Sequence, residues 1–236
     1  MHDGHRERLR ERFLREGLDS FEDHNILELL LFYVIPRKDT NELAHLLLDR
    51  FGSLSAVLEA PYEELKTVPG IGELSASLLC LIPEISRKYL GDKYSDHSIV
   101  DSTQRAGDFL MDRFVGRNKE TVILLLLDAK GRVLYCGVIA EGSVNATEVN
   151  VKRIVETSAR YNASSAILSH NHPSGIALPS KQDLDTTEIV KDALCLINVE
   201  LVDHIIVADR DFVSLAECGM LGNKNADRQN RGLKLE

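Results

Sequence analysis

The sequence predicts a two-domain α+β protein, with an all-helical N-terminal domain followed by a layered α/β domain. At 236 residues the chain is longer than one typical domain and fits two that each bury a core. Residues 5–90 carry apolar side chains at helical spacing, whereas the second half alternates short apolar runs with helical segments. A polar stretch at 91–101 separates the halves, so we expect domains at 1–92 and 102–222.

Helical spacing defines the elements of the first domain. The pattern is typified by Leu27, Leu30, Leu31 and Val34. Thr40 is a candidate N-cap for a helix at 42–51, because its hydroxyl suits the free N–H groups of a helix start. The last helix of this domain is expected at 73–89.

The second domain begins with a helix and a hairpin. Apolar runs at 121–128 and 132–140 are separated by the turn residues 129–131, a pattern typical of two antiparallel strands. Further strands are expected at 165–170, 199–208 and 212–215, and helices at 102–115, 147–161 and 180–196. Strands that alternate with helices indicate a sheet covered by helices.

Composition excludes several classes of protein. The apolar runs fall short of the roughly 18 residues that a membrane span requires, and the charged N-terminus is unlike a secretion signal. The four cysteines form no CxxC pair, which excludes a disulfide framework, a thiolate zinc cage and the PCxxC turn of zinc deaminases. A net charge of −9 argues against a protein coated in basic surface. These features predict a cytoplasmic protein that does not bind membranes.

The segment His-Asn-His at 170–172 carries the clearest chemical signal. In extended chain, His170 and His172 point the same way, so both imidazoles face one point. Asp183 lies at the third position of the following helix, whose start Ser180 is suited to cap. Two imidazoles and one carboxylate leave a fourth position of a tetrahedral Zn²⁺ open to water, as in catalytic zinc sites. On spacing alone, a polar turn and an ordinary helix-start charge explain the same residues equally well.

The chain resembles the RadC family, whose C-terminal domain is of the JAB/MPN metalloprotein type. The similarity covers the whole chain and rests on HNHPSG (170–175), PS before Asp183, DHIIV (203–207), FVS (212–214), GHRERL (4–9) and ILELL (26–30). It implies an α/β (α+β) protein with an N-terminal all-helical domain and a three-layer, mixed-sheet domain similar to cytidine deaminases. It also implies the JAMM arrangement, with His170, His172 and Asp183 as Zn²⁺ ligands.

The same resemblance implies further catalytic residues. The family uses an upstream glutamate as general acid/base, and Glu148 matches it in NATE, where many relatives read HPRE. Glu141, at the end of a predicted strand, is an alternative, whereas Glu156 is more typical of a solvated helix face. Ser180 is expected to cap its helix and, by resemblance, to steady an oxyanion. His204 is interpreted as a buried histidine beside the site rather than a fourth ligand.

A second motif lies in the helical domain. The sequence Val-Pro-Gly-Ile-Gly at 68–72 resembles a helix-hairpin-helix turn, in which Gly70, Ile71 and Gly72 would bring backbone N–H groups close to a DNA phosphate. Glutamates surround this turn and Lys66 is its nearby cation, so an ordinary interhelical bend explains the same residues equally well. Any DNA binding is expected to be weak and independent of sequence.

Three functions follow from these residues. The first is a zinc-dependent metallohydrolase, specifically a JAMM-type metallopeptidase that cleaves an amide or isopeptide bond of an unidentified peptide or protein. The second is a DNA repair or recombination factor whose zinc site is structural or inactive. A zinc nuclease is third, because one mononuclear site and an acidic chain suit phosphodiester cleavage poorly.

Overall fold

The computed structural model divides the chain into two compact units, which we call the helical unit (Met1–Lys88) and the sheet unit (Tyr89–Glu236). The structure describes residues 3–36, 38–95, 99–142, 150–209 and 211–221.

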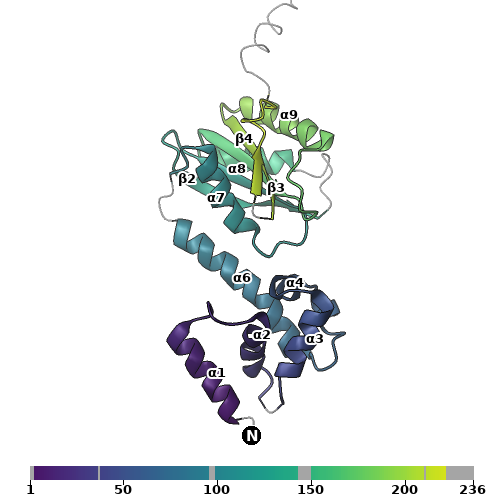
Figure 1. The fold of residues 1–236 in the computed structure, drawn as a ribbon. Helices are drawn as coiled ribbons and strands as arrows, with labels where there is room; N and C mark the ends of the chain where they lie inside the picture. Colours follow the sequence, from purple (N-terminus) through teal and green to yellow (C-terminus); the bar gives the residue numbers. More distant parts are fainter. Residues whose placement is uncertain (1–2, 37, 96–98, 143–149, 210, 222–236) are drawn as a thin grey trace, which may run out of the picture. The chain divides into compact units, whose positions relative to one another are not determined.

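Helices account for the regular structure of residues 3–95 (Figure 1). They are α1 (Asp3–Glu16), α2 (Asp23–Phe32), α3 (Asn41–Phe51), α4 (Leu54–Glu59), α5 (Tyr62–Leu65) and α6 (Glu73–Ser95). The predicted helical character of residues 5–90 is confirmed, although α6 continues past its predicted end at 89 and includes part of the segment expected to be a linker. Within the described residues, no helix has both the length and the apolar character needed to cross a bilayer.

Leucines from successive helices form the core of the helical unit. Leu27 and Leu31 of α2 pack with Leu47 of α3, and all three side chains are fully buried. Val57 of α4 and Leu65 of α5 complete the same cluster. The apolar spacing read from the sequence therefore marks the buried faces of these helices.

Thr40 is the N-cap residue of α3, as predicted, but its side chain does not cap the helix. Thr40 occupies the residue before α3, but its hydroxyl makes no capping hydrogen bond and lies instead 3.5 Å from the main-chain oxygen of Glu28. The side chain is fully buried against α2, which turns it away from the helix start. The side chain of Asp39 instead accepts a hydrogen bond from the N–H of Asn41, the first residue of α3, at 2.9 Å. Packing has overridden a local preference.

A buried carboxylate joins the first three helices. Glu28 of α2 is 1% exposed, and its two oxygens contact Nε2 of His5 in α1 (3.0 Å) and Nδ2 of Asn41 in α3 (3.1 Å). The guanidinium of Arg6 donates to the main-chain oxygen of Ile35 at 2.8 Å, just beyond α2. The two N-terminal segments GHRERL and ILELL are therefore in direct contact and fix the packing of α1 on α2.

The sheet unit contains a mixed five-stranded sheet in the order β2-β1-β3-β4-β5. Its strands are β1 (Thr121–Leu127), β2 (Val133–Glu141), β3 (Ser165–Asn171), β4 (Glu200–Ala208) and β5 (Asp211–Ser214). β3 and β4 are parallel, and every other neighbouring pair is antiparallel. The predicted hairpin and the three later strands are confirmed.

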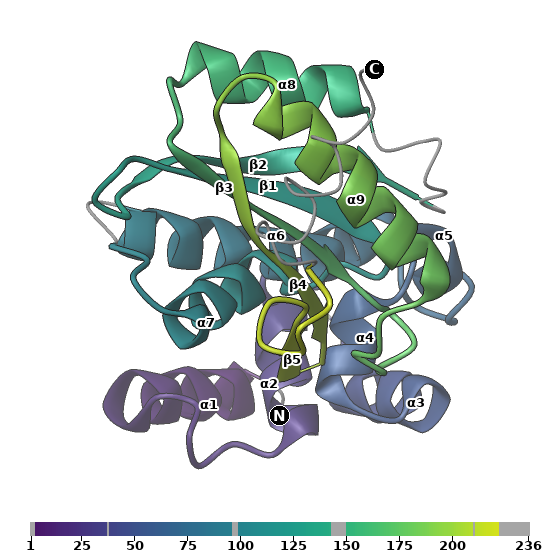
Figure 2. The same cartoon turned by 90° about the horizontal axis from the view of Figure 1, so that it is seen from above.

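Helices cover both faces of this sheet. α7 (Thr103–Phe114) packs on one face, while α8 (Val151–Arg160) and α9 (Lys181–Cys195) pack on the other, as Figure 2 shows. Alternate residues of β1 serve the two cores: Leu124 faces α8 and α9, and Leu125 faces α7. The expected three-layer α/β architecture is confirmed. The first residues of the predicted helix 147–161 lie outside the described residues, and α8 begins at Val151.

Gly107 lets α7 approach β5 closely. A Cβ atom at this position would lie 2.2 Å from Cε1 of Phe212, so the ring would have to move. We expect Gly107→Ala to lower the free energy of unfolding by about 1–3 kcal/mol through overpacking. A Cβ atom at Gly91 in α6 would meet nothing within 4 Å among the described residues, so Gly91→Ala is the matched control and should gain roughly 0.5–1 kcal/mol of helix propensity. Urea unfolding measures both, and equal stability of the two variants would contradict the packing argument.

Candidate metal centre

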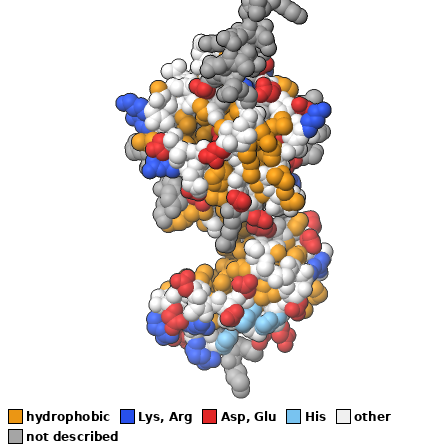
Figure 3. All heavy atoms as spheres, turned by 45° about the horizontal axis from the view of Figure 1, so that its top comes forward, with side chains coloured by type: hydrophobic (Ala, Val, Ile, Leu, Met, Phe, Trp, Pro, Cys, Tyr) orange, Lys and Arg blue, Asp and Glu red, His pale blue; other side chains and the backbone are white. Residues whose placement is uncertain are grey.

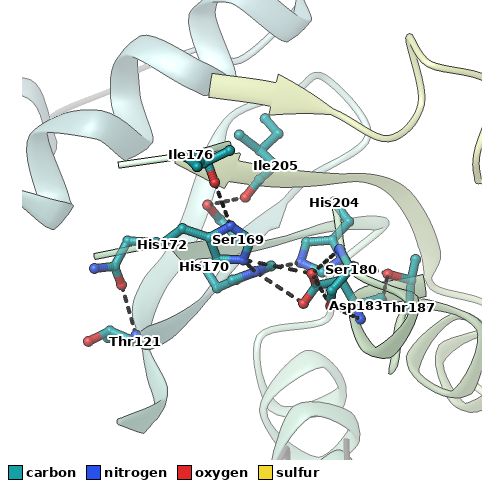
Figure 4. Close-up of polar contacts among 11 residues, drawn as sticks. Thr121, Ser169, His170, His172, Ile176, Ser180, Asp183, Thr187, His204 and Ile205 are labelled. Carbon is teal, nitrogen blue, oxygen red and sulfur yellow. Dashed lines mark hydrogen bonds and ion pairs between the residues drawn. The ribbon is translucent and has the colours of Figure 1, made fainter. Parts of the chain in front are cut away.

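Four ligand-bearing side chains meet where β1 begins and β3 ends. Glu120 directly precedes β1, His170 lies in β3, His172 follows it, and Asp183 lies in the first turn of α9. Their potential ligand atoms all lie within 4.8 Å of one another, a group that could hold a metal ion. His170, His172 and Asp183, the three residues predicted from the sequence, point toward one another (Figure 4).

The spacing of these atoms suits one small cation. Nε2 of His170 lies 2.9 Å from Nε2 of His172 and 3.2 Å from Oδ1 of Asp183, and Nε2 of His172 lies 3.7 Å from Oδ2 of Asp183. Ligands at roughly 2.0–2.1 Å from a tetrahedral zinc ion are roughly 3.3 Å apart. The two Nε2 atoms and the Asp183 carboxylate are therefore spaced as ligands of one tetrahedral cation would be.

A main-chain contact sets the tautomer of His172. Its Nδ1 lies 2.8 Å from the main-chain oxygen of Ile176, which can only accept, so Nδ1 carries the hydrogen. In the neutral ring, Nε2 then has a free lone pair and faces the other ligand atoms. The loop after β3 thus orients this imidazole for metal binding.

A chain of hydrogen bonds sets the tautomer of His170. Thr187 donates its hydroxyl hydrogen to the main-chain oxygen of Asp183 at 2.5 Å, and its oxygen accepts from Nδ1 of His204 at 2.6 Å. Nε2 of His204 is then an acceptor and takes the Nδ1 hydrogen of His170 at 2.9 Å. Nε2 of His170 is left with its lone pair toward His172 and Asp183.

His204 takes part in these hydrogen bonds as a neutral ring. It is 2% exposed in β4, and burial lowers its pKa to about 3, with the nearby His170 acting in the same direction. Asp203, its neighbour in sequence, accepts from the His204 main-chain N–H (2.7 Å) and from the Ser214 hydroxyl (2.6 Å). His204 is not part of the four-residue ligand group, in keeping with its interpretation as a histidine beside the site.

Asp183 is held by the start of its own helix. Ser180 is the N-cap of α9, and its Oγ accepts from the N–H of Asp183 (3.2 Å) and donates to Oδ2 (2.7 Å). Burial alone would raise the pKa of Asp183, but the neighbouring His170 and the hydrogen bonds donated by Ser180 outweigh it and hold this pKa well below its usual value. The carboxylate is therefore ionised at neutral pH. Because the Ser180 hydroxyl hydrogen points at Asp183, the predicted oxyanion role would require this bond to open.

The ligand group opens onto a small pocket. Val122 and Leu168 provide apolar walls beside Glu120, His170 and Asp183. The pocket has a volume of about 10 Å³, which admits one water molecule or ion and excludes an organic ligand.

Glu120 was not identified from the sequence. Strands β1 and β3 are antiparallel, with Val122 opposite His170, and continuing that register by two residues places Glu120 opposite His172. The side chains of residues 120 and 122 lie on the same side of extended chain, the side that carries the histidines. Only a glutamate directly before an apolar run marks this position in the sequence, and such residues are common.

The structure describes two of the three glutamates considered from the sequence. Glu148 lies outside the described residues, so its role stays a prediction. Glu141, at the end of β2, lies 3.7 Å from the guanidinium of Arg117 and does not join the ligand group. Glu156 is exposed on α8 and pairs with Lys152 at 3.8 Å, as expected for a solvated helix face.

The glycine turn of the helical unit has few features of a phosphate site. Gly70 has φ +97°, and the N–H of Ile71 is already used within the turn, by the oxygen of Val68 (3.0 Å). The nearby cation Lys66 pairs with Glu63 at 3.7 Å. Figure 3 shows basic and acidic side chains interspersed on the visible face of this unit, without a continuous basic stripe. DNA binding through residues 70–72 stays a prediction.

The hydrogen-bond chain to His170 predicts effects on metal affinity. Thr187→Val keeps the shape of the side chain but removes the hydroxyl, and His204→Ala removes the ring that accepts from His170. Loss of such outer partners typically weakens metal binding by roughly 10–100-fold, and we expect both variants in that range. The zinc affinity of each variant is measured by competition between the protein and a chromophoric chelator for Zn²⁺. Thr157 is a buried threonine of α8 outside the pocket, and Thr157→Val should bind Zn²⁺ as the wild type does. Equal zinc affinity in all variants would contradict the proposed role of the hydrogen-bond chain.

Burial of neutral His204 also predicts a pH dependence. Its pKa is about 3 in the folded protein, against about 6.5 when unfolded, so the unfolded state binds the proton first as pH falls. The stabilising contribution is complete above pH 6.5 and is lost progressively toward pH 3, by about 3 kcal/mol at pH 4. In urea unfolding of metal-free protein, His204→Gln should lose less stability than the wild type between pH 7 and pH 4. Parallel pH profiles would show that the ring is not buried in neutral form.

Comparisons with known proteins agree with this architecture. Residues 100–220 match the RadC-like JAB domain model, and residues 4–77 match the UPF0758 N-terminal model. A UPF0758 protein of Paraburkholderia xenovorans is 37% identical over 89% of this chain and 83% of its own length. Another, from Stutzerimonas stutzeri, is 36% identical over 91% of this chain and 96% of its own length. The fold and the paired-histidine site agree with the family models, and the relatives are similar over most of the chain. The protein therefore belongs to the RadC (UPF0758) family.

Proposed function

We propose that this protein is a zinc-dependent hydrolase, a JAMM-type metallopeptidase that cleaves amide or isopeptide bonds. One observation carries the proposal: two imidazole nitrogens without hydrogens and one ionised carboxylate converge on a single point, with a second carboxylate, Glu120, beside them. Membership in a family with a RadC-like JAB domain supports the same chemistry.

The donor set favours zinc. Imidazole and carboxylate ligands suit Zn²⁺, and His170, His172 and Asp183 would supply three of its four positions. A bound Zn²⁺ supplies Lewis acidity that brings the pKa of coordinated water to about 7. The fixed tautomers of the two histidines mean that neither ring has to lose or move a proton before it binds the ion.

Glu120 is positioned to act as the general acid/base. Its carboxylate lies in the ligand group but comes from the residue before β1, apart from the β3 and α9 segments that carry the three proposed ligands, so it can accept a proton from water at the centre and deliver it to the leaving amine. Its carboxylate borders the same small pocket as His170 and Asp183. Glu148 remains the alternative for this role, and the two are separable by substitution.

The dimensions of the pocket favour a macromolecular substrate. A volume of about 10 Å³ is far below the roughly 300–1,000 Å³ of pockets that enclose small molecules. The scissile group would therefore approach from outside the pocket. An extended peptide or an isopeptide-linked side chain fits that approach, because most of it remains outside the pocket.

Substitution of Glu120 tests the proposal. Glu120→Gln should keep one Zn²⁺ per chain, because the three proposed ligands are untouched, while turnover falls by roughly 10²–10⁴-fold with the loss of acid/base catalysis. Zinc content is measured on the purified protein, and cleavage is profiled by mass spectrometry on peptide and lysine-isopeptide libraries. Removal of zinc by a chelator should also abolish cleavage, and adding it back should restore activity.

Two further variants sharpen the result. Glu141→Gln should be active, because Glu141 pairs with Arg117 and lies outside the ligand group. If Glu148→Gln rather than Glu120→Gln abolishes cleavage, the acid/base role belongs to Glu148. A zinc-loaded wild type that cleaves nothing in either library would support a structural zinc site instead.

A further inference from the structure

The residue between the two histidines faces a different part of the molecule. Asn171 is 6% exposed, and as the middle residue of an extended segment it points away from the side that carries His170 and His172. Its Oδ1 accepts from the N–H of Thr121 at 2.8 Å, a bond drawn in Figure 4. Its Nδ2 donates to the main-chain oxygens of Arg117 and Lys119, both at 3.2 Å. All three contacts are on the segment that leads into β1.

These contacts bracket Glu120. The side chain of Asn171 hydrogen-bonds to Lys119, the residue before Glu120, and to Thr121, the residue after Glu120. The main-chain oxygen of Glu120 is itself held by the N–H of Gly142 at 2.9 Å. The side-chain amide of Asn171 thus fixes the backbone on both sides of Glu120. Asn171 itself lies in sequence between two proposed metal ligands, His170 and His172.

An asparagine is well matched to these partners. The two carbonyl oxygens require two donors and the N–H of Thr121 requires an acceptor, and one amide group supplies all three. Aspartate would keep the acceptor but lose the donors, and alanine would lose both. Ser169, two residues earlier on the same strand, also bonds main chain, but its hydroxyl donates to Ile205 of β4 at 2.7 Å.

We propose that Asn171 is a positioning residue that sets the distance between the Glu120 carboxylate and the metal ligands. His170 and His172 face the cation while the amide between them holds the segment of Glu120, so one short stretch of chain fixes both parts of the centre. This inference rests on the proposed function, in which Glu120 is the acid/base.

The test uses acetohydroxamate as a probe of the zinc-loaded protein. A hydroxamate coordinates zinc through its oxygens and can also hydrogen-bond a correctly placed neighbouring carboxylate, so its affinity reports where that carboxylate lies. Isothermal titration should show that Glu120→Gln and Asn171→Ala each weaken acetohydroxamate binding about tenfold, the effect of one charged hydrogen bond. Both substitutions act through the Glu120 carboxylate. The double variant should therefore bind acetohydroxamate no more weakly than the single variant with the lower affinity.

Zinc affinity and a matched control separate positioning from general damage. In Asn171→Ala, zinc affinity should change by less than the roughly tenfold that loss of a ligand partner causes. Asn171→Gln, which keeps the amide acceptor and donors on a side chain one methylene longer, should show a smaller loss of acetohydroxamate affinity and also covers the case in which the alanine variant does not fold. Ser169→Ala removes a buried hydrogen bond from the same strand and should leave acetohydroxamate binding unchanged.

The outcomes are distinguishable. If Glu120→Gln weakens acetohydroxamate binding but Asn171→Ala and Asn171→Gln do not, the positioning role is overturned and the proposed function stands. Additive losses in the double variant, or a zinc affinity reduced tenfold or more in Asn171→Ala, also overturn it, because Asn171 would then act on the ligands. If zinc-loaded wild type does not bind acetohydroxamate, the proposed function fails and this inference fails with it.

Discussion

The placement of β3 between β1 and β4 is the constraint on which the candidate centre depends. The parallel pairing with β4 sets His204 against His170, and the antiparallel pairing with β1 sets Glu120 opposite His172. α9 connects β3 to β4 and starts where β3 ends, so its first turn delivers Asp183 to the same point. Glu120 and His204 are distant in the sequence from His170 and His172, and they meet these histidines because β3 has two neighbours of opposite direction.

Electrostatics explains why such a site calls for a cation. The two Nε2 lone pairs and the Asp183 carboxylate lie within 2.9–3.7 Å of one another, in a pocket with apolar walls. Without a positive charge between them these atoms repel, and low local dielectric strengthens that repulsion. Ser180 donates a hydrogen bond to Asp183, and the two rings donate from Nδ1 to the main-chain oxygen of Ile176 and to His204, so that the ligands are held in place. The fold thus maintains an arrangement that a metal ion stabilises.

The helical unit depends on different physics. A leucine core and the buried carboxylate of Glu28 order its helices. Two of its cations are engaged within the unit: Lys66 pairs with Glu63, and Arg6 donates to a main-chain oxygen of the loop after α2. The RadC-like match begins at residue 100, so the chemistry proposed here belongs to the sheet unit alone.

Local patterns in the sequence determined the helices, the hairpin and the start of α9, because periodicity and capping act between neighbouring residues. They also brought His170 and His172 onto one side of a strand, since i and i+2 share a face. Tertiary structure alone decided the rest. Glu120 joins the group through the register of β1 on β3, His204 meets His170 through parallel pairing, and Thr40 fails as a cap because packing buries it. Strand register and burial depend on residues distant in the chain, so no local pattern encodes them.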